Sequence, residues 1–320
     1  MTKRAFSVAD SVLAGFALVI VLSTTQANAL PARTWVSGKG SDSNPCSLAA
    51  PCRTFAHAIN QTAPGGEIDV LDPAGYGSLT ITQSISIVND GVGEAGLQAP
   101  SGGTAITINA GSSDLIHLRG LTLEGAGVAS YGIQYNSGAS LDIVNCVIRH
   151  FSSAGISLSP ATSTNFSITK SSTSDNGNYG LILTPQATIN AVINKLTANN
   201  NAFGIVVNGG TDPQATANVT IVNSTISDNS DTALTASSAT GSGTATMMLR
   251  RVTASNNPTG VSAAGTAIVT IARSILTGNS NAFVFSGVNG TPTINSYGDN
   301  DIDGNTNNFS GGTLTSASMH

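Results

Sequence analysis

The stretch from Gly204 to Asn229, GIVVNGGTDPQATANVTIVNSTISDN, contains one full unit of the pattern that decides the fold. Gly204 opens a short apolar run, a polar loop follows, and an alternating strand-like segment ends at Asp228-Asn229. With steps of 23 to 29 residues, units of this kind begin at Gly132, Gly155, Gly180, Gly204, Ala233 and Gly260. A period in this range indicates a solenoid, because each unit is too small to bury its own apolar face.

The composition agrees with stacked strands and tight turns. The chain has 320 residues, of which 35 are Gly, and only 9% are charged and 5% aromatic. Helical bundles need many more charged and strongly helix-forming residues. The formal net charge is −5, and no basic stripe is readable, so nucleic acid is not expected as a partner.

Residues 1–29 have the pattern of a secretory signal peptide. Lys3 and Arg4 precede an apolar run over 12–22, and Ala27-Asn28-Ala29 is a small-residue cleavage site. The apolar run is shorter than the roughly 20 residues of a membrane span. We therefore expect a secreted or periplasmic protein whose mature chain has no membrane span.

Residues 30–77 differ from the repeats and are predicted to form an N-terminal cap. A strand around Trp35 precedes a polar loop, and Thr54 begins a short amphipathic helix that ends near Asn60. Cys46 and Cys52 bracket part of the loop, and an oxidising compartment favours a disulfide between them. Metal binding is the alternative, although no second Cys or His pair accompanies them. Cys146, within the repeats, is interpreted as a small buried apolar residue.

The cap segment, WVSGKGSDSNPCSLAAPCRTFAHAI followed by PGGEIDVLDPAGYG, and the repeats after it resemble the secreted β-helix proteins of the pectate-lyase-like superfamily. The resemblance covers residues 34–305. It implies a single-stranded right-handed parallel β-helix of about ten coils. We expect this β-helix over residues 78–310 and a flexible tail over residues 311–320. Enzymes of this superfamily cut or modify acidic polysaccharides, so the resemblance implies carbohydrate as the substrate class without selecting one activity.

A recurring asparagine closes most of the repeats. Asn tolerates left-handed turns, and its amide can bond to an identical amide one strand spacing (about 4.8 Å) away. We therefore expect a structural asparagine ladder at one corner of the coils, formed by Asn176, Asn200, Asn229, Asn256, Asn279 and Asn305.

A second column, six residues before the closing position, carries basic residues. Its members are Arg119, Lys170, Arg250 and Arg273. Cations spaced along a groove would match the spaced carboxylates of an anionic glycan, so these four are candidate ligand-binding residues. The alternative is a solvated turn position at which any long polar side chain is tolerated.

Glu124, His150 and Asp175 precede the closing position on three successive coils. An acid, an imidazole and a second acid stacked in this way would permit proton transfer or metal binding, so they are the candidate catalytic residues. The alternative is a polar shoulder beside the turn. Asp142 is an isolated outward carboxylate on its strand and does not make a site by itself.

Asp299, Asp301 and Asp303 match the opening of a calcium loop, but Ser310 stands where such a loop has its bidentate Glu. Calcium binding at these residues is therefore possible, and an Asp-rich coil turn is the alternative. No other cofactor is expected.

These features favour an exported, non-catalytic module that binds polysaccharide or a surface. Two alternatives stay open: a polysaccharide lyase or glycoside hydrolase with an unusual site around Glu124, His150 and Asp175, and a structural or adhesive spacer. The sequence does not determine the oligomeric state.

Overall fold

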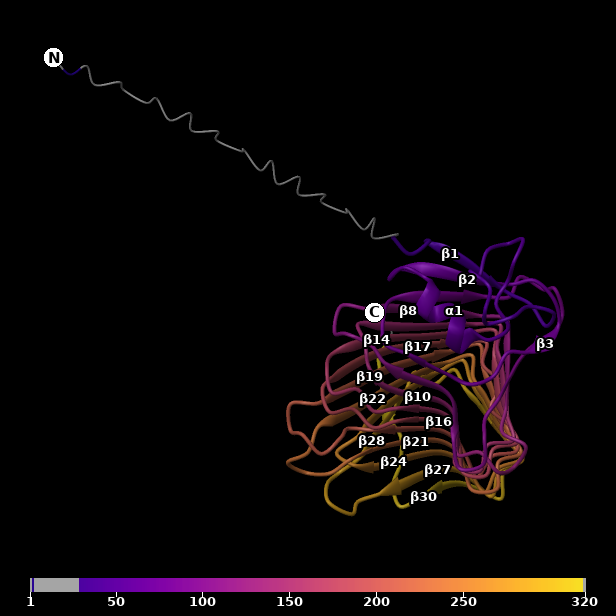
Figure 1. Ribbon diagram of the computed structural model, residues 1–320. Helices are drawn as coiled ribbons and strands as arrows, with labels where there is room; N and C mark the ends of the chain where they lie inside the picture. The colour runs from indigo at the N-terminus through magenta and orange to yellow at the C-terminus, as the bar shows by residue number, and fades with distance from the viewer. Residues whose placement is uncertain (1, 3–28, 319–320) are drawn as a thin grey trace.

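The computed structural model describes residue 2 and residues 29–318, so the predicted signal peptide falls almost wholly outside the described part. The chain winds into a right-handed parallel β-helix of about nine turns, which confirms the predicted fold class and is close to the ten coils expected. Figure 1 shows the coils stacked in chain order from the N-terminal cap to the C-terminal end.

Three sheets run along the stack. Sheet 1 has twelve strands: β1 (Arg33–Val36), β2 (Gly66–Val70), β5 (Ile85–Val88), β8 (Leu115–Arg119), β11 (Ser140–Val144), β14 (Thr164–Thr169), β17 (Thr188–Asn194), β19 (Thr216–Val222), β22 (Thr244–Arg250), β25 (Ile268–Ala272), β28 (Thr293–Ser296) and β31 (Thr315–Ser316). Sheet 2 has ten: β4 (Leu79–Ile81), β7 (Thr104–Asn109), β10 (Tyr131–Ser137), β13 (Ala154–Leu158), β16 (Tyr179–Leu183), β18 (Phe203–Asn208), β21 (Thr232–Ser238), β24 (Thr259–Gly265), β27 (Asn281–Ser286) and β30 (Asn307–Ser310).

Sheet 3 has short strands and consists of two pieces. The first contains β3 (Ala74–Gly75), β6 (Ala95–Gln98), β9 (Leu121–Glu124), β12 (Val147–Arg149) and β15 (Ser172–Ser174). The second contains β20 (Thr225–Ser227), β23 (Thr253–Ser255), β26 (Ile275–Thr277) and β29 (Asp301–Ile302). Isolated parallel bridges from Thr197 to Ser172 and to Thr225 join the two pieces.

The core follows from strand alternation. Side chains at every second strand position point inward, so one coil of sheet 1 buries Val219 and Ile221 while its neighbour buries Met247 and Leu249. Neighbouring coils bury their apolar faces on each other, as solenoid repeats must. Thr173 is an exception, because it is fully buried and its hydroxyl has no hydrogen-bond partner in the described part of the chain.

The N-terminal end of the stack is covered. Helix α1 (Phe55–Gln61) begins after Thr54, whose hydroxyl accepts a hydrogen bond from the His57 N–H at 3.1 Å. Its buried face contains Phe55, Ala58 and Ile59 and packs near β1, β2 and β4. This helix shields the first coil, whose apolar interior would otherwise face water.

The asparagine ladder forms, but two of its predicted members are wrong. The Asn176 Oδ1 accepts from the Phe151 N–H at 3.1 Å. Each later ladder amide accepts at Oδ1 from the backbone N–H and the Nδ2 of the Asn one coil before it, at 3.0–3.2 Å. Asn201 and Asn257 stand where Asn200 and Asn256 were expected, so the ladder contains Asn176, Asn201, Asn229, Asn257, Asn279 and Asn305. The cause is a slip of one residue within two runs of consecutive asparagines.

Asn200 and Asn256 instead occupy the exposed position before the ladder. Their backbones are left-handed, with φ of 56° and 58°. Their side chains donate to the carboxylates of Asp175 and Asp228 at 3.1 and 3.2 Å. The two kinds of Asn therefore have different roles, one closing the core and the other turning the chain.

The expected ends of the β-helix also shift. Strands β2 and β3 already pair with later coils, so the stack begins before residue 78. At the other end β31 pairs with β28, so strand pairing continues into the segment expected to be a flexible tail.

Candidate functional site

The seven consecutive strands of sheet 1 from β8 to β25 each lead into a corner residue with a left-handed backbone. The corner positions of successive coils have φ between 48° and 70° and are Gly120, Asn145, Lys170, Lys195, Asn223, Arg251 and Arg273. Gly and Asn accept this conformation readily, but for a Lys or Arg it costs roughly 1 kcal/mol. Four basic side chains are therefore held at the corner in a backbone conformation that does not favour them.

The predicted basic column is thus partly wrong. Lys170 and Arg273 lie at the corner, whereas Arg119 and Arg250 are the last residues of β8 and β22, one position earlier. The alignment missed Lys195 and Arg251 because three coils were placed one residue out of register. This is the same slip that displaced the asparagine ladder.

We call the residues Lys170, Lys195, Arg250, Arg251 and Arg273 the basic edge. All five are exposed. Arg273 pairs with Asp299 at 3.4 Å, whereas the other four form no ion pair with the residues of 29–318. Arg119, farther along the same sheet, pairs with Asp90 at 3.2 Å. Four uncompensated cations therefore gather at one edge of a chain whose net charge is −5.

A shallow depression of about 560 Å³ lies on the outer face of sheet 1 beside this edge. Amides from neighbouring strands line it, and the Asn218 Nδ2 donates to the Asn190 Oδ1 at 3.1 Å. Val192 adds an exposed apolar patch. The lining is Ser140, Leu141, Asp142, Asn165, Phe166, Ser167, Asn190, Ala191, Val192, Asn218 and Thr220.

The structure brings together two of the three candidate catalytic residues. The Glu124 Oε1 lies 2.9 Å from the His150 Nδ1, and its Oε2 lies 3.0 Å from the Arg149 Nε. Asp175 is bound by Asn200 and lines a different depression together with Asp228. The acid–imidazole–acid stack is therefore reduced to a Glu–His contact with an added Arg.

The environment of Glu124 favours its ionised form. Burial by itself would raise the pKa of its carboxyl, but hydrogen bonds from the Ala126 N–H, His150 and Arg149 lower that pKa below the ordinary value. A carboxyl held as an anion is a poor proton donor at neutral pH. Glu124 is therefore better suited to holding a cation or hydroxyl groups than to general acid catalysis.

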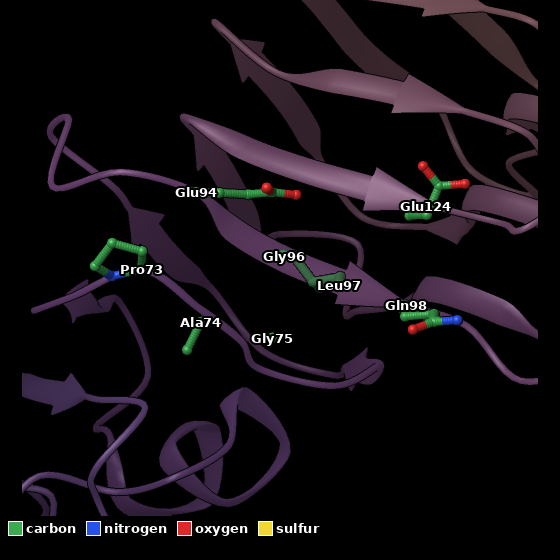
Figure 2. Close-up of a pocket in the computed structure, with 8 residues that line it drawn as sticks. All are labelled: Pro73, Ala74, Gly75, Glu94, Gly96, Leu97, Gln98 and Glu124. Atoms are coloured by element: carbon green, nitrogen blue, oxygen red, sulfur yellow. The ribbon is translucent and has the colours of Figure 1, made fainter.

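Glu124 also borders a pocket of about 390 Å³ near the cap. Figure 2 shows Glu94 and Glu124 on opposite sides of a floor that includes Gly75 and Gly96. A Cβ added at Gly75 would meet no atom within 4 Å. The space above Gly75 is therefore empty, and it forms part of the pocket.

The three aspartates of the predicted calcium loop do not converge. The Asp299 carboxylate accepts from the Arg273 N–H at 3.0 Å and pairs with its guanidinium. Within the described residues the one group of three metal-ligand side chains is Cys46, Cys52 and His57. Since Cys46 and Cys52 form a disulfide, their sulfurs are not free to bind a metal.

Cys146 is a buried free thiol. Burial raises its pKa to about 11, so it is not a thiolate nucleophile at neutral pH. In the described part of the chain no helix has the length and apolar character needed to cross a membrane.

Comparisons with known proteins agree with the fold. Residues 104–247 match the family model of the right handed beta helix region. The crystal structure of pectate lyase Pel9A has a TM-score of 0.52 at 14% identity, covering 87% of this chain and 74% of that chain. A rhamnogalacturonan lyase has a TM-score of 0.51 at 15% identity, covering 79% and 74%. No curated protein matches the chain.

These matches and the observed coils show a right-handed parallel β-helix. At 14–15% identity the likeness to the two lyases shows the shared fold alone. The function has to be argued from the surface of this chain.

Proposed function

We propose that this chain is an exported polysaccharide-binding protein that holds an anionic glycan along the basic edge without cutting its backbone. The observation that carries the proposal is the set of four uncompensated cations at Lys170, Lys195, Arg250 and Arg251. Three of the five basic-edge residues cluster within two coils, and the whole edge spans four coil steps, about 19 Å at the usual strand spacing.

Backbone strain strengthens this proposal. The same corner is occupied by Gly120, Asn145 and Asn223 on other coils, and these residues suit a left-handed φ. Lys and Arg at such positions are unfavourable for stability, and a strained backbone at a surface residue points to a role in binding. A repeating polyanion offers charges along its length that a row of cations on rigid strands can match.

Three further observations support a glycan over other polyanions. The disulfide between Cys46 and Cys52 suits an oxidising compartment outside the cytosol. The depression beside the edge offers amide and hydroxyl groups suited to sugar hydroxyls. Two solved structures of the same fold are named as lyases of pectate and of rhamnogalacturonan, both polysaccharides.

Binding to a panel of soluble polysaccharides tests the proposal. We expect polyuronates to bind at low salt and neutral glucans to bind far more weakly. The double variant Lys195→Ala/Arg251→Ala should lose about tenfold or more in affinity. The matched control Lys39→Ala/Arg53→Ala removes the same net charge in the cap, away from the basic edge, and should bind like the wild type. Equal affinities of the two double variants, or tighter binding of single-stranded DNA than of any glycan, would contradict the proposal.

A second candidate is a polysaccharide lyase or hydrolase at Glu124 and His150, and the contact between these two side chains favours it. Ultraviolet absorbance of unsaturated products, followed during incubation with polyuronates, tests for elimination, and reducing-end release tests for hydrolysis. Activity that disappears in Glu124→Gln and in His150→Ala would replace the binding proposal with this one. A protein that binds no glycan and cuts none would leave the structural spacer.

A further inference from the structure

Four polar side chains lie side by side on the outer face of sheet 1. Ser86, His117, Asp142 and Ser167 are register partners on β5, β8, β11 and β14. The His117 Nδ1 lies 2.8 Å from the Asp142 Oδ2, and the Ser167 hydroxyl donates to the Asp142 Oδ1. Asp142 is therefore fixed from both sides, and it orients the imidazole.

The Asp142 contact determines which ring nitrogen of His117 is free. A carboxylate only accepts hydrogen bonds, so the Nδ1 carries the proton and the neutral ring has its lone pair on Nε2. No residue of 29–318 hydrogen-bonds this Nε2, and the His117 side chain is 35% exposed. An imidazole held by a carboxylate, with its other nitrogen free, is the arrangement of a general base.

The side chains beside this pair could bind a carbonyl compound. Asp142 and Ser167 are themselves part of the lining of the depression on sheet 1. On the other side of His117 lies Ser86, its register partner on β5, whose hydroxyl makes no hydrogen bond to the residues of 29–318. A hydroxyl donor next to a base can bind a carbonyl oxygen that gains negative charge.

We propose that His117 is the general base of an acyl-ester hydrolase site, which removes acyl groups from the hydroxyls of a glycan on sheet 1. A water molecule attacks the ester carbonyl carbon while the His117 Nε2 takes one of its protons. The tetrahedral intermediate then breaks its bond to the sugar oxygen, which takes that proton from His117. One ester and one water become one carboxylic acid and one sugar hydroxyl.

The charges around His117 favour ester hydrolysis over proton abstraction from a uronate. A carbanion next to a carboxylate needs a cation close by to neutralise it. The charged groups facing His117 are Asp142 on β11 and Arg119 on its own strand, and Arg119 is already paired with Asp90. Asp114, at the start of β8, is bound by Ser84. An ester carbonyl is an electrophile without such a cation.

This inference rests on the proposed function only for the polymeric substrate, so its test has two arms. Acetate release is measured from an acetylated polyuronate, which needs the basic edge, and from an acetylated methyl glycoside, which does not. We expect release in both arms, and a loss of about 100-fold or more in His117→Gln. His57→Gln, the same substitution in the cap helix, is the matched control and should keep the wild-type rate.

Asp142→Asn tests the positioning residue through a readout that folding alone would not move. Asp142→Asn should lower kcat with little change in KM, and Asp142→Glu, which keeps a carboxylate beside the ring, should restore part of the rate. Circular dichroism checks that each variant remains folded, as expected for partly exposed positions. Full acetate release by a folded His117→Gln overturns the inference.

The remaining outcomes separate the two proposals. Glycan binding without acetate release from either substrate overturns the hydrolase site and leaves the binding function intact. Release from the methyl glycoside without glycan binding supports the hydrolase site and contradicts the binding function.

Discussion

Sheet 3 lies between two corners of the coil that repeat equally strictly but differ in chemistry. At one corner all ladder asparagines except Asn305 are buried, with 1–2% of their surface exposed. Their amides bond to one another along the stack. At the other corner the basic-edge side chains are exposed, and four form no ion pair with described residues. The comparison teaches that repetition by itself does not distinguish structure from function, whereas hydrogen-bond satisfaction does.

The largest effect is expected at the asparagine corner. Asn201→Ala removes an amide that bonds to Asn176, Asn229 and the Thr173 carbonyl, and leaves buried groups without partners. We expect a loss of about 3 kcal/mol in the free energy of unfolding, measured by urea denaturation. The neighbouring control Asn200→Gly keeps the left-handed turn and should cost less than about 1 kcal/mol. Equal losses would mean that the two asparagines do not differ in role.

An intermediate effect is expected between the two corners. The Thr173 hydroxyl is buried in sheet 3 without a hydrogen-bond partner among residues 29–318. Thr173→Val keeps the side-chain shape and removes the unpaired hydroxyl, so it should raise the stability by about 1 kcal/mol. Thermal unfolding of this variant beside Ile148→Val, which only deletes a buried methylene on the adjacent coil, checks the sign. A destabilised Thr173→Val would indicate a bound water at this position.

The smallest effect on stability is expected at the basic edge, where a substitution should raise the free energy of unfolding. Lys195→Asn places at the corner the residue type found at Asn145 and Asn223, which relieves an unfavourable left-handed Lys. The variant should gain about 0.5 kcal/mol while its affinity for polyuronates falls. Parallel unfolding and binding measurements test both parts. A variant that loses stability would show that Lys195 supports the fold, and the comparison between the corners would fail.

The sequence was sufficient for the architecture because inward positions such as Val219 and Ile221 repeat with the coil. It was insufficient for side-chain neighbours, because loops of different length separate the coils and the register must be known to the residue. The runs at Asn199–Asn201 and Asn256–Asn257 offered two equally good alignments. Choosing the wrong one hid Lys195 and Arg251 within the repeats.

The candidate sites show the same limit. Glu124 was assigned one position from its true row, and its contact with His150 was still found because the Glu side chain is long. His117 and Asp142 are 25 residues apart in sequence and meet only through the pairing of β8 with β11. Gly or Asn at a position suggests a left-handed backbone, but Lys or Arg does not. The strained backbone at the corner could therefore not be predicted from the sequence.

The capped N-terminal end and the repeated corner together allow the number of coils to change during evolution. Because α1 seals one end, whole turns can be gained or lost internally without rebuilding the lid. Each added turn would supply another corner position and extend the charged row by one strand spacing. The length of polymer that is gripped, and with it the avidity, would then be set by duplication of coils more than by substitution of individual residues.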